Sequence, residues 1–250
     1  MSRAKAFGIH LSLSSAALLV IFAVMRTLWY PYPLLAADGG RQAFWLLAGV
    51  TLTLGPLLTL LVFRAGKKNL RFDLAVIGLL QVVGFIFCVH LLYVRRIQMV
   101  VYSQGAFYGL DTIRIARIGP KGQALLDKLH RRPAYVFVEL PHGKKAMLGV
   151  EIRTLQGEPP IFLRGWRYRP YTAKEQSVVL AHGFAMATLA KTNHAAAAAL
   201  ARFQSQHPHL SRYAFVPFRG TYTTVVLALK RADGKVAGVL SFNPGVMGTS

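Results

Sequence analysis

The apolar segment from Ala43 to Phe63 constrains this chain more than any other feature of its sequence, because it contains no charged residue. An α-helix needs about 20 residues to cross a hydrocarbon core about 30 Å thick, so a segment of this length and composition is typical of a transmembrane helix. Apolar segments of spanning length also run from Phe7 to Met25 and from Leu74 to Val94. The sequence therefore predicts three transmembrane helices.

The short basic flanks of these helices predict the orientation of the chain, since cytoplasmic loops are enriched in Lys and Arg. Arg3 and Lys5 precede the first predicted helix, and four basic residues lie between Arg64 and Arg71, in the loop that joins the second helix to the third. We therefore expect the N-terminus and this loop to lie in the cytoplasm. With three crossings, the chain after Val94 is then exported.

The pattern changes after Arg96 from helical to alternating, which predicts a transmembrane domain over 1–96 and a separate exported domain over 97–250. The expected strands are Ile97–Tyr102, Thr112–Ile118, Tyr135–Leu140, Ala146–Ile152, Thr223–Lys230 and Lys235–Phe242. The expected helices are Gln123–His130 and Val178–Gln204, the second with a break near His182 and Gly183. Pro141–Lys145 and Asp233-Gly234 are predicted to be hairpin turns. The exported domain is therefore predicted to be α+β with an antiparallel sheet.

The chain is strongly basic, with 30 basic and 9 acidic residues and a net charge of +21. Ten basic and two acidic residues fall within 1–96, so the exported domain carries +13 of this charge. For an exported domain, anionic lipid headgroups or an acidic protein face are the expected partners, and nucleic acid is not.

A stripe of small and weakly polar residues runs along the second predicted helix, where Thr51, Gly55 and Thr59 recur every four residues and Pro56 follows Gly55. Gln81, on the third predicted helix, lies among small residues and can hydrogen-bond across a helix interface. Two interpretations remain open for this set. It either packs the three helices against one another or forms a groove for the transmembrane helix of a partner.

The segment Arg164–Tyr171 interleaves basic and aromatic side chains, a composition that suits recognition of an anionic or aromatic partner. Its candidate contact residues are Arg164, Trp166, Arg167, Tyr168, Arg169 and Tyr171. The alternative is a surface loop whose aromatic side chains pack onto the core of the domain.

Groups that could perform catalysis are scarce in this sequence. With nine acidic residues in the chain, no pair of carboxylates falls in a spacing that suggests acid/base chemistry. His207-Pro208-His209 has no Cys or acidic residue nearby to complete a metal site, and the single cysteine, Cys88, lies within a predicted span. We therefore expect neither an enzyme nor a bound metal or cofactor.

Several motifs along the chain match a known bacterial family. They are Lys5–Leu11, Trp29-Tyr30-Pro31, Asp38-Gly39-Gly40, Gly55–Leu60, Tyr168–Tyr171, Tyr213–Phe218 and Gly234–Leu240. In these motifs the chain resembles the type IV pilin accessory proteins of the TfpX/TfpZ family. The resemblance implies an inner-membrane protein of Gram-negative bacteria that acts as a chaperone or assembly factor for its cognate major type IV pilin. Other inner-membrane proteins of pilus assembly and membrane lipids are further implied partners.

The resemblance suggests a role for both candidate sites. A pilin subunit waits in the membrane as one hydrophobic helix with a globular head outside. The residues expected to contact the pilin helix are Thr51, Gly55, Pro56, Thr59 and Gln81. The basic exported domain, through Arg164–Tyr171, is expected to contact the pilin head. A rival hypothesis is a membrane-anchored sensor whose periplasmic domain binds an anionic ligand and signals through a separate partner.

Overall fold

The computed structural model describes residues 2–64, 68–130 and 132–244, so part of the basic loop between Arg64 and Arg71 lies outside the described residues. The chain divides into two compact units. The first, here called the helical unit, comprises Met1–Leu35 and Gly40–Val94. The second, here called the sheet unit, comprises Ala36–Gly39 and Arg95–Ser250.

Among the described residues, three helices are long and apolar enough to cross a membrane, which is the number expected from the sequence. The first is α1 (Arg3–Val24), which continues as the π-helical turn η1 (Met25–Trp29). The others are α3 (Gly40–Val62) and α4 (Leu70–Arg95), and the short helix α2 (Leu34–Ala37) precedes α3. Because α3 runs unbroken through Pro56, this proline does not end the helix.

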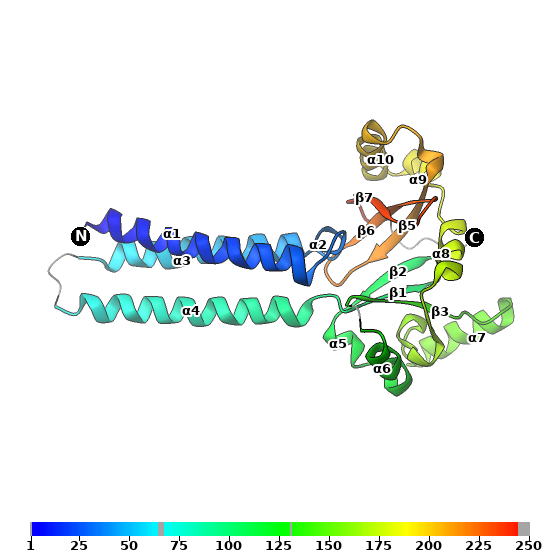
Figure 1. The fold of residues 1–250 in the computed structure, drawn as a ribbon, viewed down its shortest axis with the longest axis horizontal. Helices are drawn as coiled ribbons and strands as arrows, with labels where there is room; N and C mark the ends of the chain where they lie inside the picture. Colours follow the sequence, from blue (N-terminus) through cyan, green and yellow to red (C-terminus); the bar gives the residue numbers. More distant parts are fainter. Residues whose placement is uncertain (1, 65–67, 131, 245–250) are drawn as a thin grey trace. The chain divides into compact units, whose positions relative to one another are not determined.

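Helices α1 and α3 pack against each other, whereas α4 contributes little to the core of the helical unit (Figure 1). The α1–α3 interface includes the rings of Phe22 and Phe44, whose centroids lie 4.8 Å apart. Along α4 the one buried residue is Leu92. Apolar burial gives no driving force between helices in lipid, so α4 depends on close packing and on hydrogen bonds to stay with the other two.

The sheet unit is built on a seven-stranded mixed sheet in the order β4-β3-β1-β2-β5-β6-β7. The strands are β1 (Met99–Ser103), β2 (Ala106–Leu110), β3 (Ala134–Val138), β4 (Tyr168–Pro170), β5 (Tyr213–Arg219), β6 (Thr224–Lys230) and β7 (Val236–Leu240). The prediction of an antiparallel sheet is wrong, because β1 pairs with β3 and β2 pairs with β5 in parallel. Helical connections return the chain to the same end of the sheet, which parallel pairing requires.

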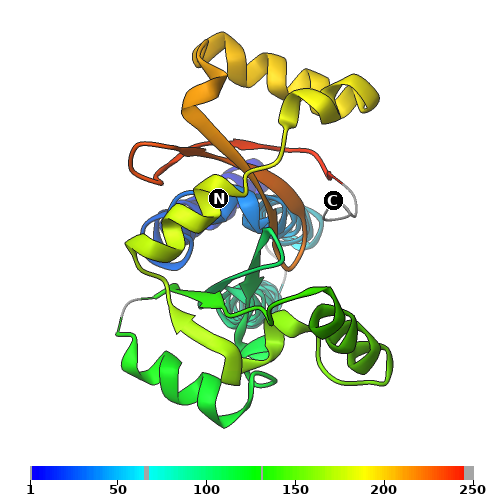
Figure 2. The same ribbon diagram turned by 90° about the vertical axis from the view of Figure 1, so that its right-hand side faces the viewer.

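Two hydrophobic clusters join the helices of this unit to the sheet, and Figure 2 shows the two groups of helices beside opposite halves of it. The first cluster packs β1, β2 and β3 against α5 (Thr112–Ile115), α6 (Gly119–Lys128) and α7 (Lys144–Leu155). The second packs β5, β6 and β7 against α9 (Met186–Thr192) and α10 (His194–Gln206). Helix α8 (Ala173–Ala181) precedes α9, so the chain leaves helix near His182 and Gly183, as the sequence predicts.

Two predicted strands are helical in the structure. Residues 112–115 of the first form α5 because the Asp111 side chain accepts a hydrogen bond from the backbone N–H of Arg114 and caps the helix. The second, Ala146–Ile152, lies within α7, so the hairpin predicted at Pro141–Lys145 is also wrong. Leu148 and Ile152 recur with a spacing of four residues, which is a helical pattern.

The hairpin predicted at the end of the domain is confirmed, since β6 pairs antiparallel with β7 around Asp233-Gly234. Strands β2, β4 and β5 escaped prediction, and β4 lies within the segment expected to be a recognition loop. Strand β2 follows β1 through the tight turn Gln104-Gly105, in which both residues have positive φ. Strand β5 contains Pro217, which usually argues against a central strand, but its pairing with β2 involves only Phe218 and Arg219.

Candidate functional site

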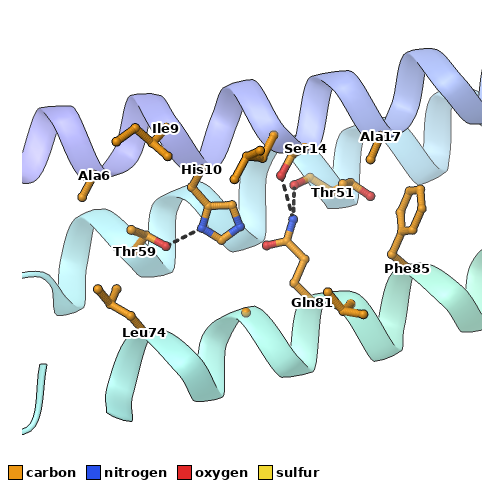
Figure 3. A pocket seen from close by; sticks show the side chains of 13 residues that line it. Ala6, Ile9, His10, Ser14, Ala17, Thr51, Thr59, Leu74, Gln81 and Phe85 are labelled. Carbon is orange, nitrogen blue, oxygen red and sulfur yellow. Dashed lines mark hydrogen bonds between the residues drawn. The ribbon is translucent and has the colours of Figure 1, made fainter. Parts of the chain in front are cut away.

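Two grooves lie between α4 and the other helices of the helical unit. The larger, here called the His10 groove, has a volume of about 440 Å³ and lies among α1, α3 and α4 (Figure 3). The smaller, here called the Gly55 groove, has a volume of about 230 Å³ and lies between α3 and α4. Volumes of this size accommodate side chains that project from a neighbouring helix, and both grooves are lined mainly by apolar groups.

Gln81 on α4 separates the two grooves and lines both of them. Its Nε2 donates hydrogen bonds to Ser14 Oγ on α1, at 3.0 Å, and to the backbone oxygen of Thr51 on α3, at 3.2 Å (Figure 3). One side chain thus ties α4 to both of its neighbours near the middle of the helices. Because α4 buries so little apolar surface, these two bonds are a substantial part of what holds it.

Gly55 is needed at its position because Gln81 occupies the space above it. A Cβ atom added to Gly55 would lie 1.4 Å from Gln81 Oε1 and 2.3 Å from Gln81 Cδ. The Oε1 atom is itself buried without a hydrogen-bond partner in the described residues. The sequence predicts that Gly55 lets another side chain approach α3 closely. In the structure that side chain is Gln81 of the same chain.

Replacing Gly55 with alanine is expected to displace the Gln81 side chain and break both of its hydrogen bonds. Hydrogen bonds between helices in membranes contribute about 0.6–2 kcal/mol each, so the helical unit should lose ~1–3 kcal/mol of stability. The matched control is Gly49→Ala on the same helix, where an added Cβ meets nothing within 4 Å. The midpoint of unfolding by sodium dodecyl sulfate compares the two variants, and equal midpoints would show that Gln81 is not held as described.

A second polar pair lies in the His10 groove, where His10 Nδ1 is 2.6 Å from Thr59 Oγ1. The Thr59 hydroxyl also donates to the backbone oxygen of Gly55 at 3.0 Å. No role was expected for His10 or Ser14, although they lie four residues apart inside an apolar run. That spacing puts both on one face of α1 and was the available signal.

The structure brings together four of the five residues that the sequence predicts to contact a partner helix. Thr51 and Gln81 line both grooves, Thr59 lines the His10 groove and Gly55 lines the Gly55 groove. Pro56 is buried and lines neither of them. The set therefore both packs the three helices and forms the walls of two grooves, so the two interpretations of the stripe are compatible.

The predicted recognition segment in the sheet unit is split between inward and outward side chains. Arg164 is 1% exposed and binds Glu158 at 3.2 Å, besides donating to the backbone oxygen of Pro159 at 2.9 Å. Tyr168 is also buried, and its hydroxyl donates to the backbone oxygen of Phe162 at 2.7 Å. Both side chains stabilise the unit in this conformation and are not available to a partner.

The remaining residues of this segment are accessible to different degrees. Trp166 is 52% exposed, and Arg169 forms an exposed ion pair with Glu139 at 2.7 Å. Arg167 is half-buried and donates to the backbone oxygen of Glu139 at 3.3 Å. Tyr171 is half-buried, and burial raises the pKa of its hydroxyl. A partner of this segment would therefore meet Trp166 and Arg169 first.

A carboxylate whose burial the sequence did not predict, although it begins the Asp38-Gly39-Gly40 motif, lies elsewhere in the sheet unit. Asp38 has no exposed surface, and its Oδ1 accepts a hydrogen bond from the backbone N–H of Thr221 in the turn between β5 and β6. A Cβ on Gly220 would lie 2.6 Å from this oxygen, so glycine is required beside it. The other oxygen, Oδ2, is buried without a hydrogen-bond partner in the described residues, and burial raises the pKa of Asp38 to about 7.

The sheet unit should therefore lose stability as the pH rises, because folding disfavours the charged form of Asp38. An unfolded aspartate titrates near pH 4, so the loss begins there and is complete above pH 7, reaching on the order of 2–4 kcal/mol. Asp38→Asn is expected to remove this dependence, so its melting temperature should change less than that of the wild type between pH 5 and pH 8.

The control for this experiment is Asp233→Asn in the turn between β6 and β7. Its carboxylate is exposed, and a hydrogen bond from the backbone N–H of Lys235 lowers its pKa, so it does not titrate between pH 5 and pH 8. Thermal unfolding of the full chain in detergent should show the wild-type pH dependence in this variant. The same dependence in Asp38→Asn would contradict the role given to Asp38.

Comparison with known proteins finds three fimbrial assembly proteins of Dichelobacter nodosus. The protein of serogroups C1 and C2 is 33% identical over 128 residues, which are 50% of this chain and 91% of that protein. The proteins of serogroups E1 and I are 34% and 32% identical over 128 residues, and the matched part spans about half of their length, 46% in each.

No protein-family model matches the chain, and no solved structure matches it. The family assignment therefore depends on the three relatives, and the similarity to the protein of serogroups C1 and C2 covers nearly all of that protein. This similarity and the three helices of spanning length in the described residues indicate a membrane-associated protein. The chain belongs to the family of the fimbrial assembly proteins.

Proposed function

We propose that this protein promotes the assembly of type IV pili by binding the transmembrane helix of its cognate major pilin in the inner membrane. It acts as an accessory protein or chaperone and catalyses no reaction. The observation that carries the proposal is the His10 groove, which runs between a tightly packed helix pair and a weakly held third helix. Membership of the fimbrial assembly family supports pilus assembly as the process that this groove serves.

The groove suits a helix better than it suits a small soluble ligand. Its walls are apolar side chains and small residues at membrane depth, which let another helix approach closely. Its polar groups lie at two levels, with Ser14, Thr51 and Gln81 at one and Thr59 beside His10 at the other, about 12 Å from Thr51 along α3. Such groups select among helices that are otherwise alike in their apolar character. A single hydrophobic helix with a few polar side chains is the occupant that fits.

The sheet unit supplies the second half of the proposed interaction. It lies in the periplasm and contacts the globular head of the pilin, with Trp166 and Arg169 as the exposed residues of the predicted segment. Once the pilin helix is bound, the pilin head is held near the sheet unit at a high effective concentration. The helix contact and the head contact can therefore each be weak alone. Such weakness lets the pilin be released when it enters the growing pilus.

Deletion of the gene tests this function, provided that pilin abundance and surface pili are measured separately. The proposal predicts fewer surface pili, restored by the wild-type gene in trans. A fall in pilin abundance would identify stabilisation as the mechanism, whereas normal pilin without pili would identify a role in assembly. Unchanged pilin and unchanged pili would contradict the proposal, and altered transcription with normal assembly would favour a sensor.

A further inference from the structure

We propose that His10 is a binding site for a carboxyl side chain on the helix that occupies the His10 groove. The inference deepens the proposed function and rests on it in taking that helix to belong to a pilin. It assigns the occupant a specific chemical feature, an acidic residue buried in the membrane at a defined depth.

The first ring nitrogen is held by Thr59. His10 Nδ1 lies 2.6 Å from Thr59 Oγ1, and the same hydroxyl donates its single hydrogen to the backbone oxygen of Gly55 at 3.0 Å. With this hydrogen assigned to Gly55, the hydroxyl oxygen accepts from His10, and the assignment places a proton on Nδ1. This bond fixes the orientation of the ring and leaves Nε2 without a hydrogen bond in the described part of the chain.

The second ring nitrogen needs a partner because of where it lies. His10 belongs to a helix of spanning length and lines the groove, and Figure 3 shows its ring projecting from α1 into the space beside α4. A polar group at this depth is costly unless it is paired, and ionisable residues inside a membrane usually face a partner or a cavity. The helix that fills the groove therefore has an unpaired polar atom to satisfy.

A carboxyl group satisfies Nε2 in either of two states. With Nδ1 already protonated, a carboxylic acid donates its proton to Nε2, or a protonated ring donates from Nε2 to a carboxylate. In both states one proton is shared between the two groups and their total charge is zero, which is the least costly arrangement in a membrane. A lysine or arginine side chain on the occupant could donate a hydrogen bond to His10 but could not accept one. It would also place a second positive charge beside the ring when the ring is protonated.

The carboxyl group has to come from the occupant. The residues that line the His10 groove include no Asp or Glu among those that the structure describes. The chain as a whole has 9 acidic and 30 basic residues, so charge complementarity favours an acid on the partner. A partner acid would also hold the occupant at one depth, since a single pair fixes its position along the groove.

The depth of the carboxyl group follows from the helix geometry. His10 lies seven residues after the first residue of α1, Arg3, and at 1.5 Å per residue this is about 10 Å from that end of the helix. The acidic residue of the occupant is therefore expected about two turns inside its own membrane segment, at the end level with Arg3. An acid near the opposite end would lie beyond the reach of His10.

The test uses synthetic transmembrane peptides and the full chain in lipid nanodiscs. Each peptide is a Leu/Ala helix of spanning length with lysines at both ends and one Glu, placed at successive positions along the series. A second series has Gln at the same positions. Energy transfer between a dye on the peptide and one on the protein reports affinity. We expect the peptide with Glu about two turns from one end to bind roughly three- to thirty-fold more tightly than the peptide with Gln at that position. At the other positions in the series, the Glu and Gln peptides should bind equally.

Two variants assign this preference to His10. His10→Leu should abolish the advantage of Glu over Gln, so that the two peptides bind this variant with equal affinity. The matched control is His90→Leu on α4, an exposed histidine outside both grooves, and it should keep the full preference. Equal binding of Glu and Gln peptides at every depth, or a preference that survives in His10→Leu, would overturn the inference.

The outcome separates this inference from the proposed function. If the peptides show the depth-dependent preference but pilin does not bind in cells, the carboxyl site stands and the identity of the partner is wrong. If pilin binds in the groove but the peptides show no preference, pilin docking stands and the role of His10 is wrong.

Discussion

Gly78→Phe is expected to reduce the amount of pilin that co-purifies with this protein at least tenfold. Gly78 lines the His10 groove, and a Cβ at this position would meet nothing within 4 Å, so a phenyl ring can enter the groove without disturbing the helix backbone. The ring would take the space that the account gives to side chains of the pilin helix. Affinity purification of the full chain from pilin-producing cells, followed by quantification of pilin, measures the effect.

Two glycines with equally open surroundings serve as controls. Gly8→Phe on α1 and Gly49→Phe on α3 also add a ring where a Cβ meets nothing within 4 Å, but neither glycine lines a groove. Both variants should retain wild-type pilin. Gly84→Phe fills the Gly55 groove instead, and a loss of pilin in this variant alone would mean that the occupant lies on the other side of Gln81.

Arg164→Leu is expected to lower the free energy of unfolding of the sheet unit by ~3 kcal/mol. The side chain is buried and binds Glu158, the backbone oxygen of Pro159 and Thr154 Oγ1, the last at 3.0 Å. Removing a buried charge leaves its partners without a donor, and the cost of such unpaired groups exceeds the value of an ordinary hydrogen bond. Unfolding in urea, followed by Trp166 fluorescence with Trp29 and Trp45 replaced by Phe, measures the loss.

Arg169→Leu in the same segment is the matched control. Its ion pair with Glu139 is solvent-exposed, and exposed pairs contribute less than about 1 kcal/mol. Trp166→Ala should weaken the contact with the pilin head. A loss of several kcal/mol in Arg169→Leu, or none in Arg164→Leu, would show that the division into structural and exposed residues is wrong.

The sequence predicted the helical unit well because length and apolar composition decide it. A charge-free segment such as Ala43–Phe63 needs no knowledge of tertiary contacts to be identified as a helix of spanning length. The spacing of Thr51, Gly55 and Thr59 likewise placed them on one face of α3. His10 and Ser14 were missed because their partners lie 49 and 67 residues away along the chain.

The sheet unit was harder to predict because its architecture depends on contacts between distant segments. Nothing local distinguishes a strand that pairs in parallel, as β1 does with β3, from one that pairs antiparallel. Residues 146–152 alternate enough to suggest a strand, but Leu148, Ile152 and Leu155 follow a helical spacing that continues beyond them. The burial of Arg164 and Asp38 could not be predicted, since charged residues are usually exposed. The Thr221 N–H that binds Asp38 is 183 residues away, whereas the hydrogen-bond partners of Arg164 are all within 14 residues of it.

Photo-crosslinking in living cells tests the central claim, that the His10 groove holds the pilin helix, most directly. A photoreactive amino acid is placed at Leu13, which lines the groove and is 67% exposed, or at Leu19 on the same helix, which lies outside both grooves and is 70% exposed. We expect the photoreactive amino acid at position 13 to crosslink to the transmembrane segment of pilin. At position 19 we expect no crosslink above background. Equal capture of pilin from both positions, or none from either, would contradict it.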